Sequence, residues 1–149
     1  MGKRLILPLL LALLLIGSNY NLSAQLYINE FMASNTGTYS DGADWIEIYN
    51  AGTTTVQLQG YYLTDNLNNK TKWQIKTKTE IQGGKFLVFI ADTTRTGMHT
   101  NFKLSASGEE IGLANPSGVM IDSIIFGQQE PNISMGRKTD GSSEWGFFT

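Results

Sequence analysis

Past its first 24 residues, the chain consists of short β-type runs, each closed by residues that favour turns. The run 45–49 alternates strictly, so its two isoleucines share one face, as in a strand buried on one side. The sequence Asn-Pro-Ser-Gly at 115–118 lies between apolar runs at 110–114 and 119–126, which is a strong hairpin signal. No segment of this part repeats apolar residues every three and four positions behind a capping signal. The pattern therefore predicts an all-β protein.

Further runs raise the expected number of strands to seven or eight. They lie at 26–31, 56–58, 61–63, 72–76 and 86–90. The last of them is apolar on both faces, so we expect it to be the central strand, covered on both sides. Parallel strands need crossover helices, which the pattern lacks, so we expect an antiparallel β-sandwich, with an open barrel as the alternative.

The N-terminal segment has the layout of a secretory signal peptide. Lys3 and Arg4 precede an apolar run at 5–16, and a Leu-Ser-Ala sequence follows at 22–24. The apolar run is too short to span a bilayer, and no later segment is apolar enough. We therefore expect a signal peptide at 1–24, one mature domain at 25–149, no membrane span, and secretion to the periplasm, the cell surface or the medium.

Composition argues against two classes of protein, those stabilised by disulfide bonds and those that bind nucleic acid. The chain has no cysteine, so apolar burial and not disulfide bonds must stabilise it after export. Without the predicted signal peptide, nine basic residues face 13 acidic ones, a formal net charge of −4. This charge argues against nucleic acid as a partner, even though Lys70, Lys72, Lys76 and Lys78 cluster around Trp73. We expect these lysines to protect an exposed strand edge from pairing.

Six segments of the mature chain match one known family in order. They are 28–35 (INEFMASN), 44–50 (DWIEIYN), 58–65 (LQGYYLTD), 81–88 (IQGGKFLV), 101–109 (NFKLSASGE), and the group 121–123 (IDS), 134–137 (SMGR) and 140–141 (DG). Together they resemble the lamin-tail domain, the immunoglobulin-like sandwich at the C-terminal end of nuclear lamins, which also occurs in secreted bacterial proteins. The resemblance implies an all-β, immunoglobulin-like antiparallel β-sandwich.

The same resemblance implies a non-enzymatic accessory module. Such modules usually accompany other domains in surface or exported proteins, and no catalytic residues are attributed to them. We therefore expect an exported bacterial module that binds a protein or a polymer and needs no cofactor. Three alternatives stay open, namely a carbohydrate-binding module, a positioning domain of a larger exported protein, and a metal-assisted hydrolase that uses the aspartates.

Candidate metal ligands are Asp41, Asp44 and Asp65, because carboxylates in polar loops suit calcium. Their spacing does not match an EF-hand loop, and turn formation is the stronger explanation of these residues. His99, the only histidine, lies in a polar loop, where we expect a solvated residue with no catalytic role. Near the C-terminus, we expect Arg137 and Asp140 to form a surface ion pair across a turn.

Candidate ligand-binding residues are Trp45, Tyr61 and Trp73. Sugar rings stack on flat aromatic faces, and the mature chain has more large aromatic residues than a small core needs. The alternation at 45–49 places Trp45 opposite the isoleucines, so one of the two faces is expected to be exposed. The alternative is that these rings form part of the core.

Overall fold

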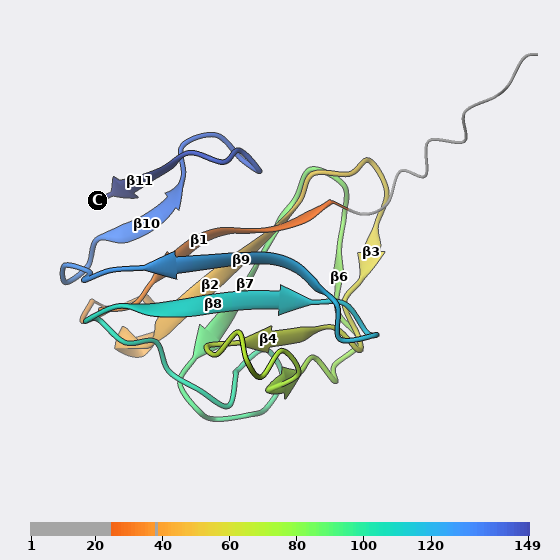
Figure 1. Cartoon of the computed structure of the whole chain (residues 1–149), viewed down its shortest axis with the longest axis horizontal. Helices are drawn as coiled ribbons and strands as arrows, with labels where there is room; N and C mark the ends of the chain where they lie inside the picture. Colours follow the sequence, from red (N-terminus) through yellow and green to blue (C-terminus); the bar gives the residue numbers. More distant parts are fainter. Residues whose placement is uncertain (1–24, 38) are drawn as a thin grey trace, which may run out of the picture.

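The computed structural model describes residues 25–37 and 39–149, which form an antiparallel β-sandwich (Figure 1). The predicted signal peptide lies outside the described residues. The elements are β1 (Leu26–Met32), the 3₁₀ turn η1 (Tyr39–Gly42), β2 (Asp44–Asn50), β3 (Val56–Gln57), β4 (Tyr62–Thr64), β5 (Trp73–Gln74), β6 (Glu80–Ile81), β7 (Phe86–Ala91), β8 (Glu109–Ala114), β9 (Met120–Phe126), β10 (Ser134–Arg137) and β11 (Trp145–Phe148).

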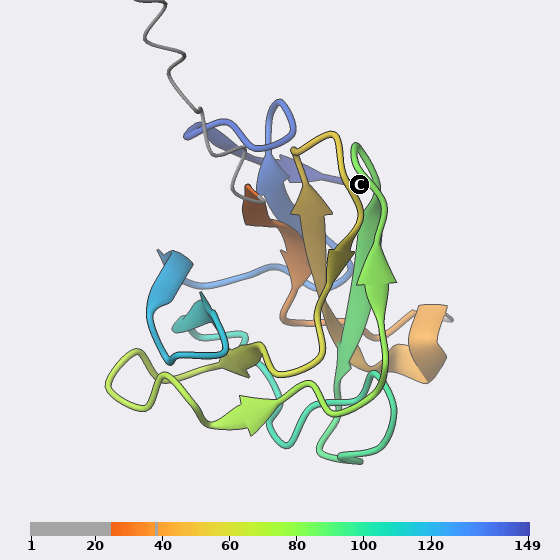
Figure 2. The ribbon, with the colours of Figure 1, turned by 90° about the vertical axis from the view of Figure 1, so that its right-hand side faces the viewer.

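Two main sheets form the sandwich. The five-stranded sheet has the order β11-β10-β1-β2-β7, and the four-stranded sheet has the order β5-β4-β8-β9. All strand pairs in both sheets are antiparallel, and a small sheet of β3 and β6 lies beside them. Figure 1 shows β8 and β9 in front of β1, β2 and β7. In Figure 2, turned by 90°, β4 and β5 run across the lower part of the molecule, below strands such as β2 and β7 that run vertically in this view. The prediction of an immunoglobulin-like sandwich is therefore confirmed.

The core lies between the two sheets and follows the alternation of the strands. Ile46 and Ile48 of β2 point inward and are fully buried, as their spacing predicted. The four-stranded sheet contributes Ile111 and Leu113 of β8 to the same core. Each such side chain stabilises the fold by about 1.5–3 kcal/mol when it leaves water. In a chain without cysteine, this burial stabilises the sandwich.

The run 86–90 is not a central strand, which corrects the expectation drawn from its apolar sequence. It forms β7 at the edge of the five-stranded sheet, where Phe86 is exposed and Val88 is half-buried. One edge of β7 pairs with β2, and the other edge is bonded by an irregular segment instead of a strand. There, Thr100 N–H donates to Ile90 O at 2.8 Å and Ile90 N–H donates to Met98 O at 2.9 Å. The apolar residues on the outward face of β7 are therefore accessible.

The hairpin of β10 and β11 extends the five-stranded sheet, with β10 paired to β1 and β11 at the edge. Arg137 does not pair with Asp140 as predicted, but with Asp122 of the opposite sheet, at 2.8 Å between Nη2 and Oδ2. Asp122 Oδ2 also accepts the Ile28 N–H at 2.7 Å, and Arg137 Nε donates to Ile28 O at 2.9 Å. The two side chains thus bond the backbone of β1 as a neighbouring strand does.

Candidate functional site

The outward face of the five-stranded sheet is largely apolar and aromatic, although the outer face of such a sheet is usually polar. The strand register places three rows of side chains across β1, β2 and β7. The rows are Met32–Trp45–Ile90, Glu30–Glu47–Val88 and Tyr27–Tyr49–Phe86. In the last row, the rings of Tyr49 and Phe86 are stacked at 4.8 Å between centroids. The face therefore offers aromatic and aliphatic surface at both ends, with carboxylates between them.

A hollow of about 360 Å³ lies at one end of this face. It is lined by Met32, Asn35, Gly37, Tyr39, Trp45, Glu47, Val88 and Asn132. The rings of Tyr39 and Trp45 meet nearly at right angles, with centroids 5.9 Å apart and an interplanar angle of 74°. Tyr39 is 56% exposed, so its ring is available to a ligand. We name this feature the Tyr39–Trp45 hollow.

Asn35 holds the loop that carries Tyr39. Its side-chain Nδ2 donates to the carbonyls of Tyr39 and Ala43, at 2.8 and 2.6 Å, and its Oδ1 accepts the Gly37 N–H at 3.1 Å. Asn35 is buried, and its amide replaces backbone pairing inside the loop. The loop is thereby fixed from within, which presets the position of Tyr39.

Asn132 closes the other side of the hollow. Its Oδ1 accepts the Thr36 N–H at 2.8 Å, and its Nδ2 donates to Thr36 Oγ1 at 2.9 Å. These bonds join the segment before β10 to the loop after β1, across 96 positions of sequence. Neither Tyr39 nor Asn132 was a predicted site residue, because only the long-range fold brings them beside Trp45.

Glu47 is the acidic residue in the lining. Its Oε1 accepts a hydrogen bond from Asn29 Nδ2 at 3.1 Å, and the same Nδ2 lies 3.1 Å from Asp140 Oδ1. Burial raises the pKa of Glu47 above its ordinary value, and the carboxylates of Glu30 and Asp140 raise it further, against the hydrogen bond from Asn29. The hollow thus presents a carboxyl acceptor beside two aromatic rings.

The three predicted ring residues have different environments. Trp45 is half-buried and lines the hollow, while its indole N–H, also buried, has no hydrogen-bond partner among the described residues. Trp73 is a core residue, 8% exposed, with its ring against Phe89 at 5.9 Å. Tyr61 packs against the same core. Of the three, Trp45 alone belongs to the Tyr39–Trp45 hollow.

The three predicted metal ligands do not come together. Asp41 is exposed on η1, Asp44 Oδ1 accepts the Asn35 N–H at 3.1 Å, and Asp65 pairs with Lys72 at 2.6 Å. Burial raises the pKa of Asp44, against hydrogen bonds from the backbone of Asn35 and Leu104. Within residues 25–37 and 39–149, no three His, Asp or Glu side chains are grouped as a metal site. Calcium binding therefore stays an untested hypothesis, beside the expectation that the protein needs no cofactor.

His99 forms a pair with Asp92, at 2.7 Å between Nδ1 and Oδ2, and is not simply solvated. Burial raises the pKa of Asp92, but hydrogen bonds from Thr94 and His99 outweigh it, so that the pKa lies below its ordinary value. A catalytic triad also needs a nucleophile at the other imidazole nitrogen. In the described part of the chain, that nitrogen makes no hydrogen bond.

The fold and this face together define an immunoglobulin-like sandwich with a ligand-sized hollow on its outer surface. The family model of the Lamin Tail Domain matches residues 21–128, so the chain belongs to the lamin tail domain family. No curated protein matches the chain. The matched range ends shortly after β9, which leaves β10, β11 and Asn132 outside it. In the described part, no helix has the length and apolar character needed to cross a membrane.

Proposed function

We propose that this protein is an exported, non-enzymatic binding module that holds a glycan in the Tyr39–Trp45 hollow. The observation that carries the proposal is the pair of rings at 74°, which borders a hollow lined also by amides and a carboxylate. Ligand sites combine apolar walls with a few convergent polar groups in this way.

The chemistry of the lining favours a sugar. A pyranose has a C–H face that packs on an aromatic ring and hydroxyl groups at its edge that need donors and acceptors. Tyr39 and Trp45 supply the rings, and Glu47 supplies an acceptor at the same hollow. If a purely apolar protein surface covered the hollow, the carboxyl of Glu47 would lose its water without gaining a hydrogen-bond partner, which is unfavourable.

Binding without catalysis fits the same residues. Glycoside hydrolysis needs two carboxyl groups on either side of the scissile bond, and among the described residues that line the hollow Glu47 alone carries a carboxylate. The family to which the chain belongs consists of immunoglobulin-like domains that are generally non-catalytic. Export follows from the predicted signal peptide at 1–24, so the natural ligand is an extracellular or cell-surface polymer.

The test is glycan binding by the purified chain from Gln25 onward. Soluble β-glucan, xylan, mannan and chitin oligosaccharides are titrated by calorimetry while tryptophan fluorescence is recorded. We expect at least one glycan to bind, and Trp45→Ala or Tyr39→Ala to weaken it by about tenfold or more. Phe147→Ala is the matched control, because Phe147 is an exposed aromatic residue outside the hollow. Equal loss in all three variants, or no binding to any glycan, contradicts the proposal.

The calcium hypothesis is tested in the same preparation by thermal melting with calcium and with EDTA. A ligand that binds only the folded state raises the melting temperature. A rise with calcium that Asp41→Asn abolishes supports a metal site at η1. Equal melting temperatures in calcium and EDTA contradict it.

A further inference from the structure

A second hollow, of about 440 Å³, lies beside β5. It is lined by Tyr62, Thr71, Lys72, Trp73, Gln74, Lys76, Thr77, Arg95, Gly97 and Asn101. Three of these residues are cationic and none is acidic. The hollow shares no residue with the Tyr39–Trp45 hollow. We name it the β5 groove.

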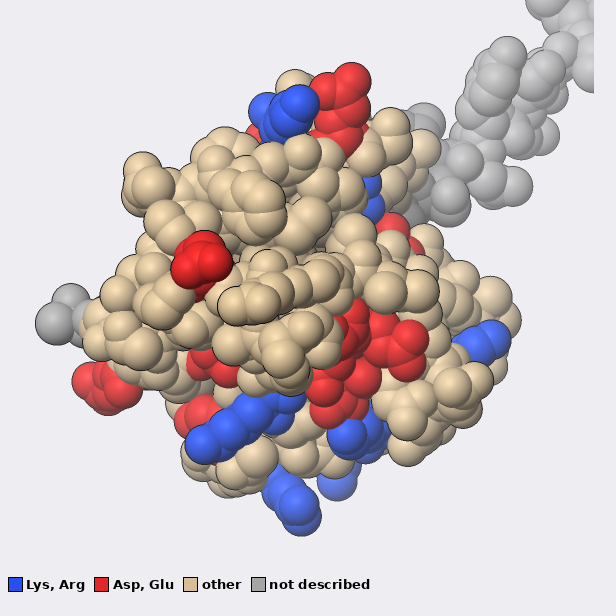
Figure 3. Space-filling model, turned by 60° about the vertical axis from the view of Figure 1, so that its left-hand side comes forward, with Lys and Arg blue, Asp and Glu red and all other residues tan. Residues whose placement is uncertain are grey.

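The positive charge of the β5 groove is available to a ligand. Lys76 and Arg95 are exposed and form no ion pair among the described residues, whereas Lys72 pairs with Asp65. Basic side chains gather toward the lower end of the molecule, below a band of acidic ones (Figure 3), and Figure 1 shows β4 and the loop 92–108 at this end. A chain of net negative charge thus concentrates cations at one end.

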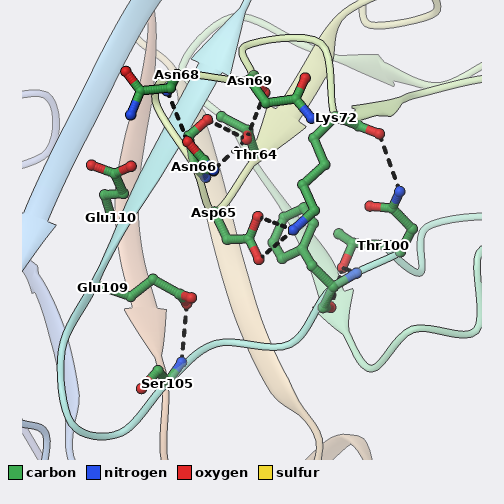
Figure 4. A network of polar contacts seen from close by, with 12 residues as sticks. Thr64, Asp65, Asn66, Asn68, Asn69, Lys72, Thr100, Ser105, Glu109 and Glu110 are labelled. Atoms are coloured by element: carbon green, nitrogen blue, oxygen red, sulfur yellow. Dashed lines mark hydrogen bonds and ion pairs between the residues drawn. The ribbon is translucent and has the colours of Figure 1, made fainter.

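The walls of the groove are fixed by hydrogen bonds. Thr64 Oγ1 lies 2.9 Å from the carbonyl oxygens of both Asn66 and Asn69 and shares its one proton between them, which closes the turn between β4 and β5 (Figure 4). Asn101 Nδ2 donates to Lys72 O at 3.1 Å, which joins this turn to the segment after β7. A site ordered before binding loses less conformational entropy when the ligand enters.

We propose that the β5 groove binds an acidic polysaccharide, with Lys76 and Arg95 as the principal contacts to its anionic groups. Lys76 supplies a point charge, and Arg95 supplies a planar fork of donors that fits a carboxylate or a sulfate. The neutral lining, which includes Gln74, Asn101 and Thr77, offers hydrogen bonds to sugar hydroxyls.

An acidic polysaccharide accounts for the groove better than nucleic acid does, and better than protection of an edge strand by lysines does. Single-stranded nucleic acid needs exposed rings on which successive bases stack, but Trp73 is 8% exposed and Tyr62 is half-buried. Lysines that only protect the edge strand β5 need charge and no hollow. An acidic polysaccharide uses both the charge and the hydroxyl and amide lining.

The experiment measures binding of the chain from Gln25 onward to immobilised polygalacturonate and dextran sulfate at two salt concentrations. We expect both polymers to bind, binding to fall as salt rises, and neutral dextran to fail. The variant Lys76→Gln/Arg95→Gln should weaken binding by about tenfold or more. Lys85→Gln/Lys138→Gln changes net charge equally, and neither residue lines the groove, so it should retain binding within about twofold.

Three results overturn the proposal. One is failure of both acidic polymers to bind at low salt, and another is equal loss in the two double variants, which indicates non-specific attraction. The third is tighter binding to single-stranded DNA that depends on Lys76 and Arg95. Thermal melting shows whether each variant is folded. Binding of neutral glycans through Trp45 is measured separately, so failure at the groove and failure at the Tyr39–Trp45 hollow are distinguished.

Discussion

Arg137 contacts a strand of each sheet, Ile28 of β1 and Asp122 of β9. Its guanidinium bonds Asp122, Ile28 O and Ser142 O, and it lies over the rings of Tyr27 and Trp145, at 5.2 and 4.8 Å from their centroids. Lysine has the same charge but lacks the planar fork, so it cannot make these bonds together. We expect Arg137→Lys to destabilise the fold by about 2–4 kcal/mol, a fall in melting temperature of about 6–20 °C.

The measurement for Arg137 is thermal unfolding, with Lys138→Gln as the control. Lys138 neighbours Arg137 but is largely exposed and lies 3.5 Å from Glu144, so its loss should change stability by less than about 1 kcal/mol. A double-mutant cycle with Asp122→Asn isolates the pair, and we expect a coupling of about 1–3 kcal/mol. Additive effects of the two changes contradict the role given to Arg137.

Different constraints disfavour a side chain at the two adjacent glycines Gly83 and Gly84. A Cβ on Gly83 would lie 2.5 Å from the backbone carbon of Thr53, whereas Gly84 has open space but a φ of +68°. We expect Gly84→Ala to cost about 1 kcal/mol through strain and Gly83→Ala to cost about 2 kcal/mol or more, because backbone has to move. Chemical denaturation of both variants tests this order, and the opposite order contradicts it.

At the scale of elements, the β10–β11 hairpin completes the sandwich although it lies outside the range matched by the family model. Trp145 packs 6.1 Å from Phe31, and Arg137 bonds the backbone of β1. We expect a chain that ends at Gln128 to lose cooperative unfolding or at least about 3 kcal/mol of stability, since β1 loses one of its two neighbours and Asp122 loses Arg137. Circular dichroism melts of 25–128 and 25–149 measure this, and equal melting temperatures contradict it.

The local sequence pattern predicted which segments form strands better than it predicted where each strand lies in its sheet. The alternation of β2 and the hairpin of β8 and β9 were predicted because side-chain period and turn chemistry are local properties. The edge position of β7 was not, because it depends on pairing with residues 98–100, which the pattern does not encode. For the site the same limit holds, since Trp45 was a candidate but Tyr39 and Asn132 reach it only through the fold.

At the scale of the whole molecule, stability should depend on pH through carboxyls with shifted pKa values. Burial raises the pKa of Asp44, Glu47 and Glu109, so between about pH 4 and neutrality the folded state binds more protons than the unfolded chain, and stability falls as pH rises. Asp92 has a lowered pKa, so its contribution is present above about pH 4 and is lost below it.

The two effects together predict a stability maximum at about pH 4–5. Calorimetric melts from pH 3 to pH 8 measure this profile. The variant Asp44→Asn/Glu47→Gln/Glu109→Gln should flatten the fall between pH 5 and pH 7, because amides keep the shape and carry no charge to desolvate. Asp92→Asn should instead reduce the loss below pH 4. A profile that rises steadily to pH 7, or a slope unchanged in the triple variant, means that burial of these carboxyls does not set the pH dependence of this fold.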